Sequence, residues 1–283
     1  MKKIVVLGSN GQLGSCFRDI EFEFTDYELH FFSSKQINIT DLVKVEQIFS
    51  KFKFNYCINC AAYTKVDLAE EDKDKAFKVN VEGIKNLVEV CNKFNVCLVS
   101  FSTDYVFDGK QKKPYTELCK PNPINYYGKT KYEGEKAILN SSYKFFIIRV
   151  SWLYSRNGNN FVNTIINLTK AKKEIGVVSD QYGTPTSAES LVYFILHIIK
   201  LDSKDYGLYH FSNRGIVSWY DLAKSIIKNL NLTTTIKPIG TNEFITKANR
   251  PNFSCLNLTK TENTFNFFIE DWEKELKKHL SNE

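Results

Sequence analysis

A glycine-rich turn near the start of the chain restricts its fold more than any other feature. Residues 4–7 form an apolar run rich in β-branched side chains, and Gly8, Gly11 and Gly14 follow it at Gly-x-x-Gly-x-x-Gly spacing. Such a run is typical of a strand buried in a parallel sheet. Glycines at this spacing let the backbone turn tightly and approach a pyrophosphate at the amino end of the next helix. The position of the turn, after a strand and before a helix, favours a dinucleotide site over an ordinary loop.

Strand-like and helical segments alternate after this turn. Further strands are expected at residues 28–32, 56–60, 96–102 and 144–150. Helices are expected at residues 41–52 (capped by Thr40), 72–94, 127–140 and 270–279. This alternation is typical of an α/β fold with a parallel sheet. We predict a Rossmann-like doubly wound parallel sheet in a cofactor-binding domain over residues 1–150. A smaller, mainly substrate-binding lobe, partly interleaved with it, is expected over residues 151–283.

Tyr127 and Lys131 are the main candidates for acid–base chemistry. At i and i+4 they share one face of a helix, so the ammonium can lie near the phenol and lower its pKa. Thr103, at the end of the preceding strand, can hold a carbonyl oxygen. Such a set would deliver a proton to a ketone. Because Tyr and Lys are abundant here, the pair alone also fits an exposed helix face, and the glycine turn favours the catalytic interpretation.

Six segments carry more specific patterns. They are residues 59–70 (NCAAYTKVDLAE), 102–109 (STDYVFDG), 127–135 (YGKTKYEGE), 149–152 (RVSW), 158–161 (GNNF) and 180–186 (DQYGTPT). Together they resemble the dTDP-4-dehydrorhamnose reductases of the extended short-chain dehydrogenase/reductase superfamily. The resemblance implies reduction of the C4 ketone of dTDP-4-dehydro-L-rhamnose to dTDP-L-rhamnose for polysaccharide synthesis. It implies NADPH as cofactor, with NADH as an alternative, and a nucleotide-diphosphate sugar as substrate.

The resemblance also assigns residues to roles. Thr103, Tyr127 and Lys131 are expected to be catalytic. The expected cofactor-binding residues are Gly8, Asn10, Gly11, Gln12, Leu13, Gly14, Ser33, Ser34, Lys35, Asn38, Ile39, Ala61, Ala62, Tyr63, Asn80, Tyr127 and Lys131. The expected substrate-binding residues are Thr103, Asp104, Tyr105, Trp152, Asn159, Asn160, Gln181 and Arg250. Packing explains Asp104, Tyr105 and Trp152 nearly as well, and a buried capping role explains Asn80 equally well.

Two positions depart from the family pattern. Asn38 stands where these reductases usually carry an aspartate expected to meet the adenine, so adenine binding would rely on an amide. Cys16 stands where some members carry a glutamate that binds Mg²⁺ between subunits. Glu189 matches a second ligand of that kind, but the carboxylate set is incomplete, and we predict no metal.

Other functions remain open at this point. Sugar-nucleotide 4-epimerases and 4,6-dehydratases share the Tyr/Lys pair. Dehydratases commonly carry Thr-Asp-Glu where this chain has Thr103-Asp104-Tyr105, which disfavours elimination. A non-catalytic NADP-binding regulatory subunit is the rival from another class, and the intact Thr103, Tyr127 and Lys131 argue against it.

Composition excludes several classes of protein. Of 283 residues, 43% are hydrophobic and 25% charged, and the net charge of +6 is spread without a basic block, so we expect no nucleic-acid partner. Only four strongly apolar residues separate Lys3 from Gly8, and no run approaches the roughly 20 apolar residues of a membrane span. The seven scattered cysteines are typical of a reducing compartment. We expect a cytoplasmic monomer or homodimer without a membrane partner.

Overall fold

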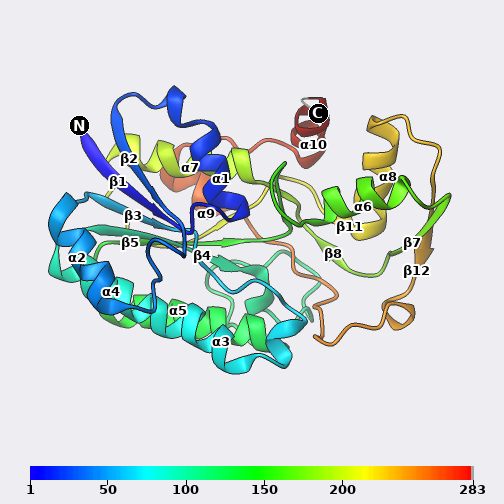
Figure 1. Ribbon diagram of the computed structural model, residues 1–283. Helices are drawn as coiled ribbons and strands as arrows, with labels where there is room; N and C mark the ends of the chain where they lie inside the picture. Colours follow the sequence, from blue (N-terminus) through cyan, green and yellow to red (C-terminus); the bar gives the residue numbers. More distant parts are fainter. Residues whose placement is uncertain (282–283) are drawn as a thin grey trace.

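A six-stranded parallel sheet forms the centre of the computed structural model, which describes residues 1–281 (Figure 1). Its order is β10-β5-β4-β3-β1-β2. The strands are β1 (Lys2–Leu7), β2 (Tyr27–Phe32), β3 (Tyr56–Asn59), β4 (Cys97–Thr103), β5 (Phe145–Val150) and β10 (Gly207–Phe211). From β1 the chain moves outward to β2 and then crosses to the other side of β1 with β3. The direction of winding therefore changes between β1 and β3, where open α/β sheets bind their ligands.

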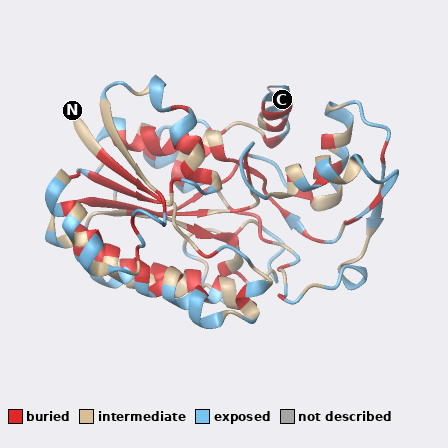
Figure 2. Cartoon of the chain, in the orientation of Figure 1, coloured by how far each residue is buried: buried red, intermediate tan, exposed pale blue. Residues whose placement is uncertain are grey.

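Helices cover both faces of this sheet. On one face lie α1 (Gln12–Asp19), α7 (Ala188–Leu201) and α9 (Thr259–Phe265). On the other lie α2 (Leu42–Phe52), α4 (Gly83–Lys93) and α5 (Tyr126–Ser141). Alternation along β1 explains the two layers, because Ile4 and Val6 pack under the first group and Val5 and Leu7 under the second. Figure 2 shows the inner strands of the sheet mostly buried, the edge strand β2 at intermediate burial and the outer helix faces exposed. The predicted doubly wound parallel α/β fold is confirmed.

A smaller lobe with its own apolar core lies beside the sheet, on the right in Figure 1. Its helices are α6 (Phe161–Thr169), α8 (Trp219–Asn229) and α10 (Trp272–Ser281). Its strands pair as β7 (Glu174–Val178) with β12 (Thr235–Ile239), β8 (Tyr182–Gly183) with β11 (Val217–Ser218), and β6 (Leu153–Tyr154) with β9 (Thr186–Ser187). The segment after residue 150 also returns to the sheet, to which it adds the helix α7 and the edge strand β10. The division at residue 150 stays a prediction.

Two helix predictions need correction. The single helix expected over residues 72–94 is α3 (Lys73–Phe77), a π-helical turn η3 (Lys78–Glu82) and α4. The helix α2 is capped by Asp41 rather than Thr40, because the Asp41 carboxylate accepts a hydrogen bond from the Lys44 backbone N–H at 3.1 Å. The remaining elements are the 3₁₀ turns η1 (Glu21–Glu23), η2 (Leu68–Glu70), η4 (Asp104–Val106) and η5 (Thr241–Glu243).

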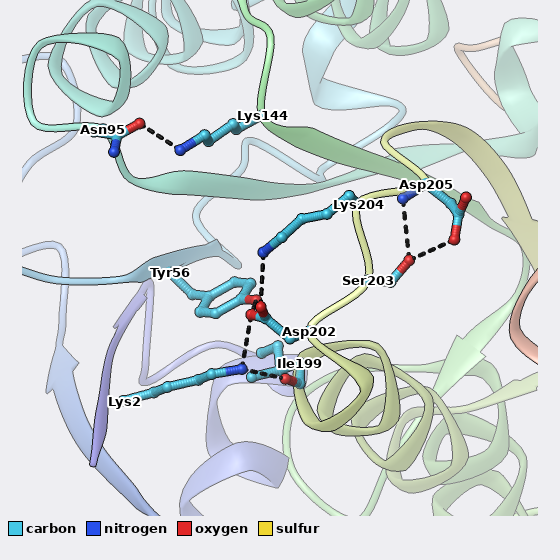
Figure 3. A network of polar contacts seen from close by, with 9 residues as sticks. All are labelled: Lys2, Tyr56, Asn95, Lys144, Ile199, Asp202, Ser203, Lys204 and Asp205. Atoms are coloured by element: carbon cyan, nitrogen blue, oxygen red, sulfur yellow. Dashed lines mark hydrogen bonds and ion pairs between the residues drawn. The ribbon is translucent and has the colours of Figure 1, made fainter.

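Polar contacts around Asp202 join the start of the sheet to the end of α7 (Figure 3). Its Oδ1 accepts hydrogen bonds from Lys2 Nζ at 2.8 Å and Tyr56 Oη at 2.9 Å, and Oδ2 accepts one from Lys204 at 2.8 Å. Lys2 also bonds the Ile199 carbonyl. The network lies at the amino ends of β1 and β3, which leaves their carboxyl ends free for a site. Within residues 1–281 no helix is both long and apolar enough to cross a bilayer.

Candidate functional site

A cavity of about 380 Å³ opens where the carboxyl ends of the central strands meet the smaller lobe. It is lined by Gly11, Gln12, Leu13, Asn59, Cys60, Ala62, Thr64, Val66, Phe101, Ser102, Thr103, Asp104, Tyr105, Tyr127, Lys131, Val150, Trp152, Leu153, Asn159 and Trp219. The cavity thus brings the glycine turn, the Thr103 segment and the Tyr127 helix together, as the sequence motifs predict.

The glycine turn is shaped by close backbone contacts. Gly8 has φ +73°, and a Cβ there would lie 2.6 Å from the Ala61 nitrogen. A Cβ on Gly14 would lie 2.5 Å from the Gly8 carbonyl oxygen. The helix α1 then begins at Gln12 with no side-chain cap and no acidic residue in its first turn. Its amino end therefore points unmatched N–H groups toward the cavity, which suits a pyrophosphate.

The helix α5 is held so that Tyr127 faces the end of β4. Asn125 caps it, with Oδ1 accepting from the Gly128 N–H at 2.8 Å. A Cβ on Gly128 would lie 2.1 Å from the Tyr105 carbonyl oxygen, so only glycine allows the helix to approach η4 this closely. The rings of Tyr105 and Tyr127 meet edge to face with centroids 6.1 Å apart. The approach places the phenol beside Thr103 and Asp104.

Burial raises the pKa of Tyr127 above its ordinary value, the nearby Thr103 hydroxyl lowers it, and the Asp104 charge raises it further. The sequence-based expectation that Lys131 lowers this pKa needs correction, because the lysine is directed elsewhere. Lys131 Nζ donates a hydrogen bond to the Phe101 carbonyl oxygen at 2.7 Å. At neutral pH the Tyr127 phenol is therefore fully protonated, as a proton donor must be.

Lys131 is itself a buried base, 7% exposed. Burial lowers its pKa to about 8, and the negative charge of Glu135, one helical turn further along α5, raises it. Glu135 forms a buried bidentate ion pair with Arg149 of β5, with contacts of 2.8 and 2.7 Å. Arg149 Nη1 lies 3.4 Å from His210 Nε2 on β10. The carboxylate between the two cations helps to keep the Lys131 ammonium charged inside the protein.

Asn80 joins the β3 loop to α5. Its Oδ1 accepts from the Tyr63 N–H at 2.9 Å, and its Nδ2 donates to the Tyr63 carbonyl and to Thr130 Oγ1, both at 3.0 Å. Asn80 sits in the π-helical turn η3, an irregularity that often marks a functional region. The side chain does not line the cavity. It holds the loop of Ala61, Ala62 and Tyr63 against the helix that carries Tyr127.

Two stacked indoles close the cavity on the side of the smaller lobe. Trp152 and Trp219 lie with centroids 3.4 Å apart and planes 7° apart. Trp152 has φ +46°, which a bulky side chain rarely adopts, and Gly183 leaves room for its ring. Residues with strained backbone conformations cluster at ligand sites, so the positive φ of Trp152 at the cavity wall is consistent with a role in ligand binding.

The whole chain matches one known protein family. The sequence profile described as "RmlD substrate binding domain" covers residues 1–283. The dTDP-4-dehydrorhamnose reductase of Aggregatibacter actinomycetemcomitans is 38% identical over 287 residues, 98% of each chain. The chain belongs to the dTDP-4-dehydrorhamnose reductase family. The resemblance drawn from the six motif segments is thereby confirmed.

Solved structures agree with this membership of the reductase family. A dTDP-4-dehydrorhamnose reductase from Clostridium acetobutylicum has a TM-score of 0.95 at 40% identity, covering 99% of each chain. That of Bacillus anthracis str. Ames, solved in complex with NADP, has a TM-score of 0.94 at 38% identity and covers 100% of each chain. The spore coat polysaccharide biosynthesis protein SpsK of Bacillus subtilis is 36% identical over 281 residues, 99% of this chain and 97% of that protein.

Several residues predicted from the family pattern lie outside the cavity. They are Gly8, Asn10, Gly14, Ser33, Ser34, Lys35, Asn38, Ile39, Ala61, Tyr63, Asn80, Asn160, Gln181 and Arg250. Ser33 to Ile39 follow β2, at the far side of the glycine turn, with Ser34, Lys35 and Asn38 exposed. Their roles stay predictions.

Three predicted substrate contacts are already engaged within the protein. Asn160 caps α6 and donates to Gln12 Oε1 at 3.2 Å. Gln181 is buried and donates to Thr241 Oγ1 at 3.1 Å. Arg250 pairs with Asp67. These bonds connect the two lobes or neighbouring loops, so each side chain would have to add a substrate contact to a structural one.

Sequence reasoning missed other residues that line the cavity. They are Asn59, Cys60, Val66, Phe101, Ser102, Val150, Leu153 and Trp219, whereas Thr64, expected with Ala61, Ala62 and Tyr63 in the loop that faces the nicotinamide, does line it. Most lie inside the motif segments 59–70, 102–109 and 149–152, and Phe101 and Leu153 directly adjoin two of them, so assigning every residue of each motif to the site would have found nearly all. Trp219 had no such signal, because it begins α8, far from any motif of the family.

Cys16 and Glu189 line a second cavity of about 210 Å³ with Asp19 and His279. Glu189 accepts a hydrogen bond from Lys278 Nζ at 2.8 Å. Among residues 1–281 no group of three or more His, Cys, Asp or Glu side chains is arranged to hold a metal ion.

Proposed function

We propose that this chain reduces the C4 ketone of dTDP-4-dehydro-L-rhamnose to the alcohol of dTDP-L-rhamnose, with NADPH as the reductant. The observation that carries the proposal is that Thr103, Tyr127 and Lys131 line one cavity with the uncapped amino end of α1, in a member of this reductase family. A proton donor, a hydroxyl and a cation next to a dinucleotide cradle are the groups that ketone reduction requires.

The cofactor would lie along the glycine turn, where the closely packed Gly8 and Gly14 leave no room for a side chain. Bound NADPH supplies the hydride to the ketone carbon. Tyr127 gives its proton to the ketone oxygen, Thr103 donates a hydrogen bond to the same oxygen, and Lys131 binds the nicotinamide ribose hydroxyls. Ser33, Ser34 and Lys35, after β2, provide hydroxyls and a cation for a 2′-phosphate.

The sugar nucleotide would occupy the side of the cavity that faces the smaller lobe. Trp152 offers a flat wall and Asn159 an exposed amide there. Asp104 and Tyr105 border the same space from η4. We propose that the substrate binds in this part of the cavity and that its product serves polysaccharide synthesis. We further propose that the enzyme works in the cytoplasm as a monomer or a homodimer.

A second 4-keto sugar nucleotide should be compared with dTDP-4-dehydro-L-rhamnose as a substrate. A relative from Streptomyces niveus, 33% identical over 222 residues (78% of this chain), is a dTDP-4-keto-6-deoxy-D-glucose reductase. That sugar nucleotide carries the same C4 ketone with a different ring configuration. The residues assigned to proton transfer can act on the C4 ketone of either sugar nucleotide. Selectivity between the two sugars would therefore come from Trp152, Asn159 and Trp219, which form the cavity wall on the side of the smaller lobe.

The decisive experiment incubates the purified protein with NADPH and each of the two 4-keto sugar nucleotides, with a uridine-linked analogue as a third. NADPH oxidation and product analysis are followed together. We expect turnover with dTDP-4-dehydro-L-rhamnose and dTDP-L-rhamnose as product. Cofactor that copurifies and is not consumed would point to an epimerase, and tight partner binding without turnover would point to a regulatory subunit.

A further inference from the structure

Thr130 is a buried polar residue of α5 that takes no direct part in the proposed reaction. It lies between Tyr127 and Lys131 in the sequence, but only 1% of its surface is exposed and it does not line the cavity. Threonine is a weaker helix former than alanine, because its branched side chain loses rotamer freedom in a helix. Its presence in a buried turn of α5 therefore points to a use for its hydroxyl group.

The Thr130 hydroxyl makes two hydrogen bonds. Its Oγ1 donates to the Tyr127 carbonyl oxygen at 2.8 Å and accepts from Asn80 Nδ2 at 3.0 Å. A hydroxyl group has one hydrogen to donate and two lone pairs to accept, so both contacts can form together. The single hydrogen is used at the backbone of Tyr127, because a carbonyl oxygen can only accept.

Asn80 is itself held by the backbone of the loop after β3. Its Oδ1 accepts from the Tyr63 N–H at 2.9 Å, and its Nδ2 gives a hydrogen to the Tyr63 carbonyl oxygen at 3.0 Å. The second hydrogen of Nδ2 goes to Thr130, so the amide is fully used. A continuous set of hydrogen bonds thus runs from the Tyr63 backbone through two buried side chains to the Tyr127 carbonyl.

Other side chains hold the N–H groups at the amino end of α5. Glu70 Oε1 accepts from the Tyr126 N–H, and Asn125 Oδ1 accepts from the Gly128 N–H, both at 2.8 Å. The Thr130 hydroxyl acts instead at the carbonyl of Tyr127 itself. A hydroxyl that donates to the carbonyl one turn earlier changes the local bend of a helix. It therefore affects the direction in which the Tyr127 side chain leaves the backbone.

We propose that Thr130 is a positioning residue: its hydroxyl joins the Tyr127 carbonyl to Asn80 and so fixes the first turn of α5 in the orientation that brings the Tyr127 phenol to the ketone oxygen. The inference rests on the proposed reductase function. It adds to that function a residue that touches neither substrate nor cofactor.

The reaction is sensitive to this orientation for a geometric reason. A general acid must lie within hydrogen-bonding distance of the atom that it protonates, and a displacement of about 1 Å can lower a rate by orders of magnitude. The loop at residues 61–63 is expected to face the nicotinamide. Because Asn80 bonds the backbone of this loop, the same hydrogen bonds maintain the spacing between the proton donor and the proposed hydride donor.

The test uses three substitutions of Thr130 and one control. Thr130→Val keeps the shape of the side chain without its hydroxyl, and Thr130→Ser keeps the hydroxyl. Thr130→Ala also removes the hydroxyl but places no methyl group against the Asn80 amide, so it serves where valine prevents folding. The control is Thr169→Val in α6, because Thr169 Oγ1 donates to the Ile166 carbonyl, also three residues earlier, at 2.7 Å and lies outside the cavity.

Single-turnover rates are measured with saturating NADPH and sugar nucleotide, and each ligand is titrated separately. We expect Thr130→Val and Thr130→Ala to lower the rate about tenfold or more, with both dissociation constants within about twofold of wild type. Thr130→Ser and Thr169→Val should stay within about twofold of the wild-type rate. A wild-type rate in Thr130→Ala, or an equal loss in Thr130→Ser, would overturn the proposal.

A double variant tests whether Thr130 acts through Tyr127. In Tyr127→Phe the proton donor is already absent, so adding Thr130→Ala should not lower the residual single-turnover rate further. A loss of about tenfold on this background would mean that Thr130 acts through the fold or through another residue, which would also overturn the proposal.

Hydrogen exchange of backbone amides gives a readout that needs no turnover. Thr130→Ala should speed exchange in peptides that cover residues 126–132, because the turn opens more often, whereas Thr169→Val should leave these peptides unchanged. Unchanged exchange in Thr130→Ala would overturn the positioning role. If wild type reduces none of the 4-keto sugar nucleotides, the proposed function fails, and exchange still decides whether Thr130 fixes the turn. If wild type is active and Thr130→Ala matches it in rate and exchange, only the positioning role fails.

Discussion

Arg250 and Asp67, 183 residues apart, form a bidentate ion pair beside the cavity, with contacts of 3.1 Å between Nη1 and Oδ1 and 2.7 Å between Nη2 and Oδ2. The arginine hydrogen bond lowers the pKa of Asp67. Burial opposes the charge on Arg250, but the pair with Asp67 raises the arginine pKa. The Arg250 charge also lies close enough to Tyr105, which lines the cavity, to lower the pKa of that phenol. The pair thus ties the C-terminal segment to the loop after β3.

Arg250→Ala is expected to weaken sugar-nucleotide binding about tenfold or more, which corresponds to roughly 1.5–3 kcal/mol, because a charge-assisted hydrogen bond to the diphosphate is lost. NADPH affinity should not change, and Arg250→Lys should restore only part of the loss, since lysine lacks the planar fork. Separate titrations with each ligand check this. Asp67→Asn distinguishes two roles of Arg250. If Arg250 binds the diphosphate directly, sugar-nucleotide affinity should be retained in Asp67→Asn. If Arg250 only stabilises the loop through its ion pair with Asp67, this affinity should fall. Equal weakening of both ligands would assign Arg250 to the fold.

Tyr127→Phe is expected to lower kcat by about two to four orders of magnitude, because the substitution removes the general acid and little else. Dissociation constants for both ligands should stay close to wild type. The matched control is Tyr126→Phe on the preceding residue, which does not line the cavity. Steady-state kinetics check both variants. Near-normal turnover in Tyr127→Phe would remove the residue from the mechanism.

Lys131→Met tests how much the buried Lys131 ammonium lowers the free energy of unfolding. Because the folded-state pKa is lowered from 10.5 to about 8, the unfolded chain binds more protons between these values, and wild type gains stability as pH rises through this window. The gain relative to Lys131→Met should reach about 3 kcal/mol. Urea unfolding at pH 7.5 and at pH 10.5 measures it, with Lys129→Met, an exposed neighbour, as control. A constant difference between wild type and Lys131→Met at the two pH values would contradict the buried-charge interpretation.

Lys35→Ala is expected to shift cofactor preference toward NADH. Lys35 is exposed just after β2, where a cation can meet the 2′-phosphate of NADPH. Its loss should reduce kcat/KM for NADPH about tenfold while leaving the value for NADH unchanged. The control is Lys51→Ala at the end of α2. An unchanged ratio of the two kcat/KM values, or a wild type that prefers NADH, would show that other groups select the cofactor.

Gly183→Ala should disturb the indole wall. A Cβ at residue 183 would lie 2.3 Å from Trp152, whereas the nearest atom to a Cβ on Gly240 is 3.6 Å away. Overpacking is expected to reduce the free energy of unfolding by about 1–3 kcal/mol and to weaken sugar-nucleotide binding, with NADPH binding retained. Gly240→Ala should change neither quantity. Urea unfolding and ligand titration measure both, and a Gly183→Ala protein of normal affinity would exclude Trp152 from the substrate wall.

Much of the fold could be predicted because its signals are local. The apolar run before Gly8 and the glycine spacing identify the first strand and its turn, since both depend on the conformations of consecutive residues. The same locality explains the strand ends that bear Thr103 and the face that Tyr127 shares with Lys131. Where the prediction failed, a tertiary contact intervened. The expected long helix is interrupted at η3, where Asn80 bonds the Tyr63 backbone, and a pattern of apolar spacing does not register such a bond.

The sequence by itself determined the α/β class, the cofactor turn and the identity of the groups that can move a proton, because each of these follows from neighbouring residues or from motifs of fixed spacing. Only the tertiary structure decided what those groups touch. It directs Lys131 to the Phe101 carbonyl, pairs Arg250 with Asp67 and stacks Trp219 on Trp152. Each contact joins segments far apart in the chain, and its geometry depends on how the sheet, helices and smaller lobe pack together. Spacing along a sequence carries no information about that packing, so the site's chemistry could be predicted while its connections could not.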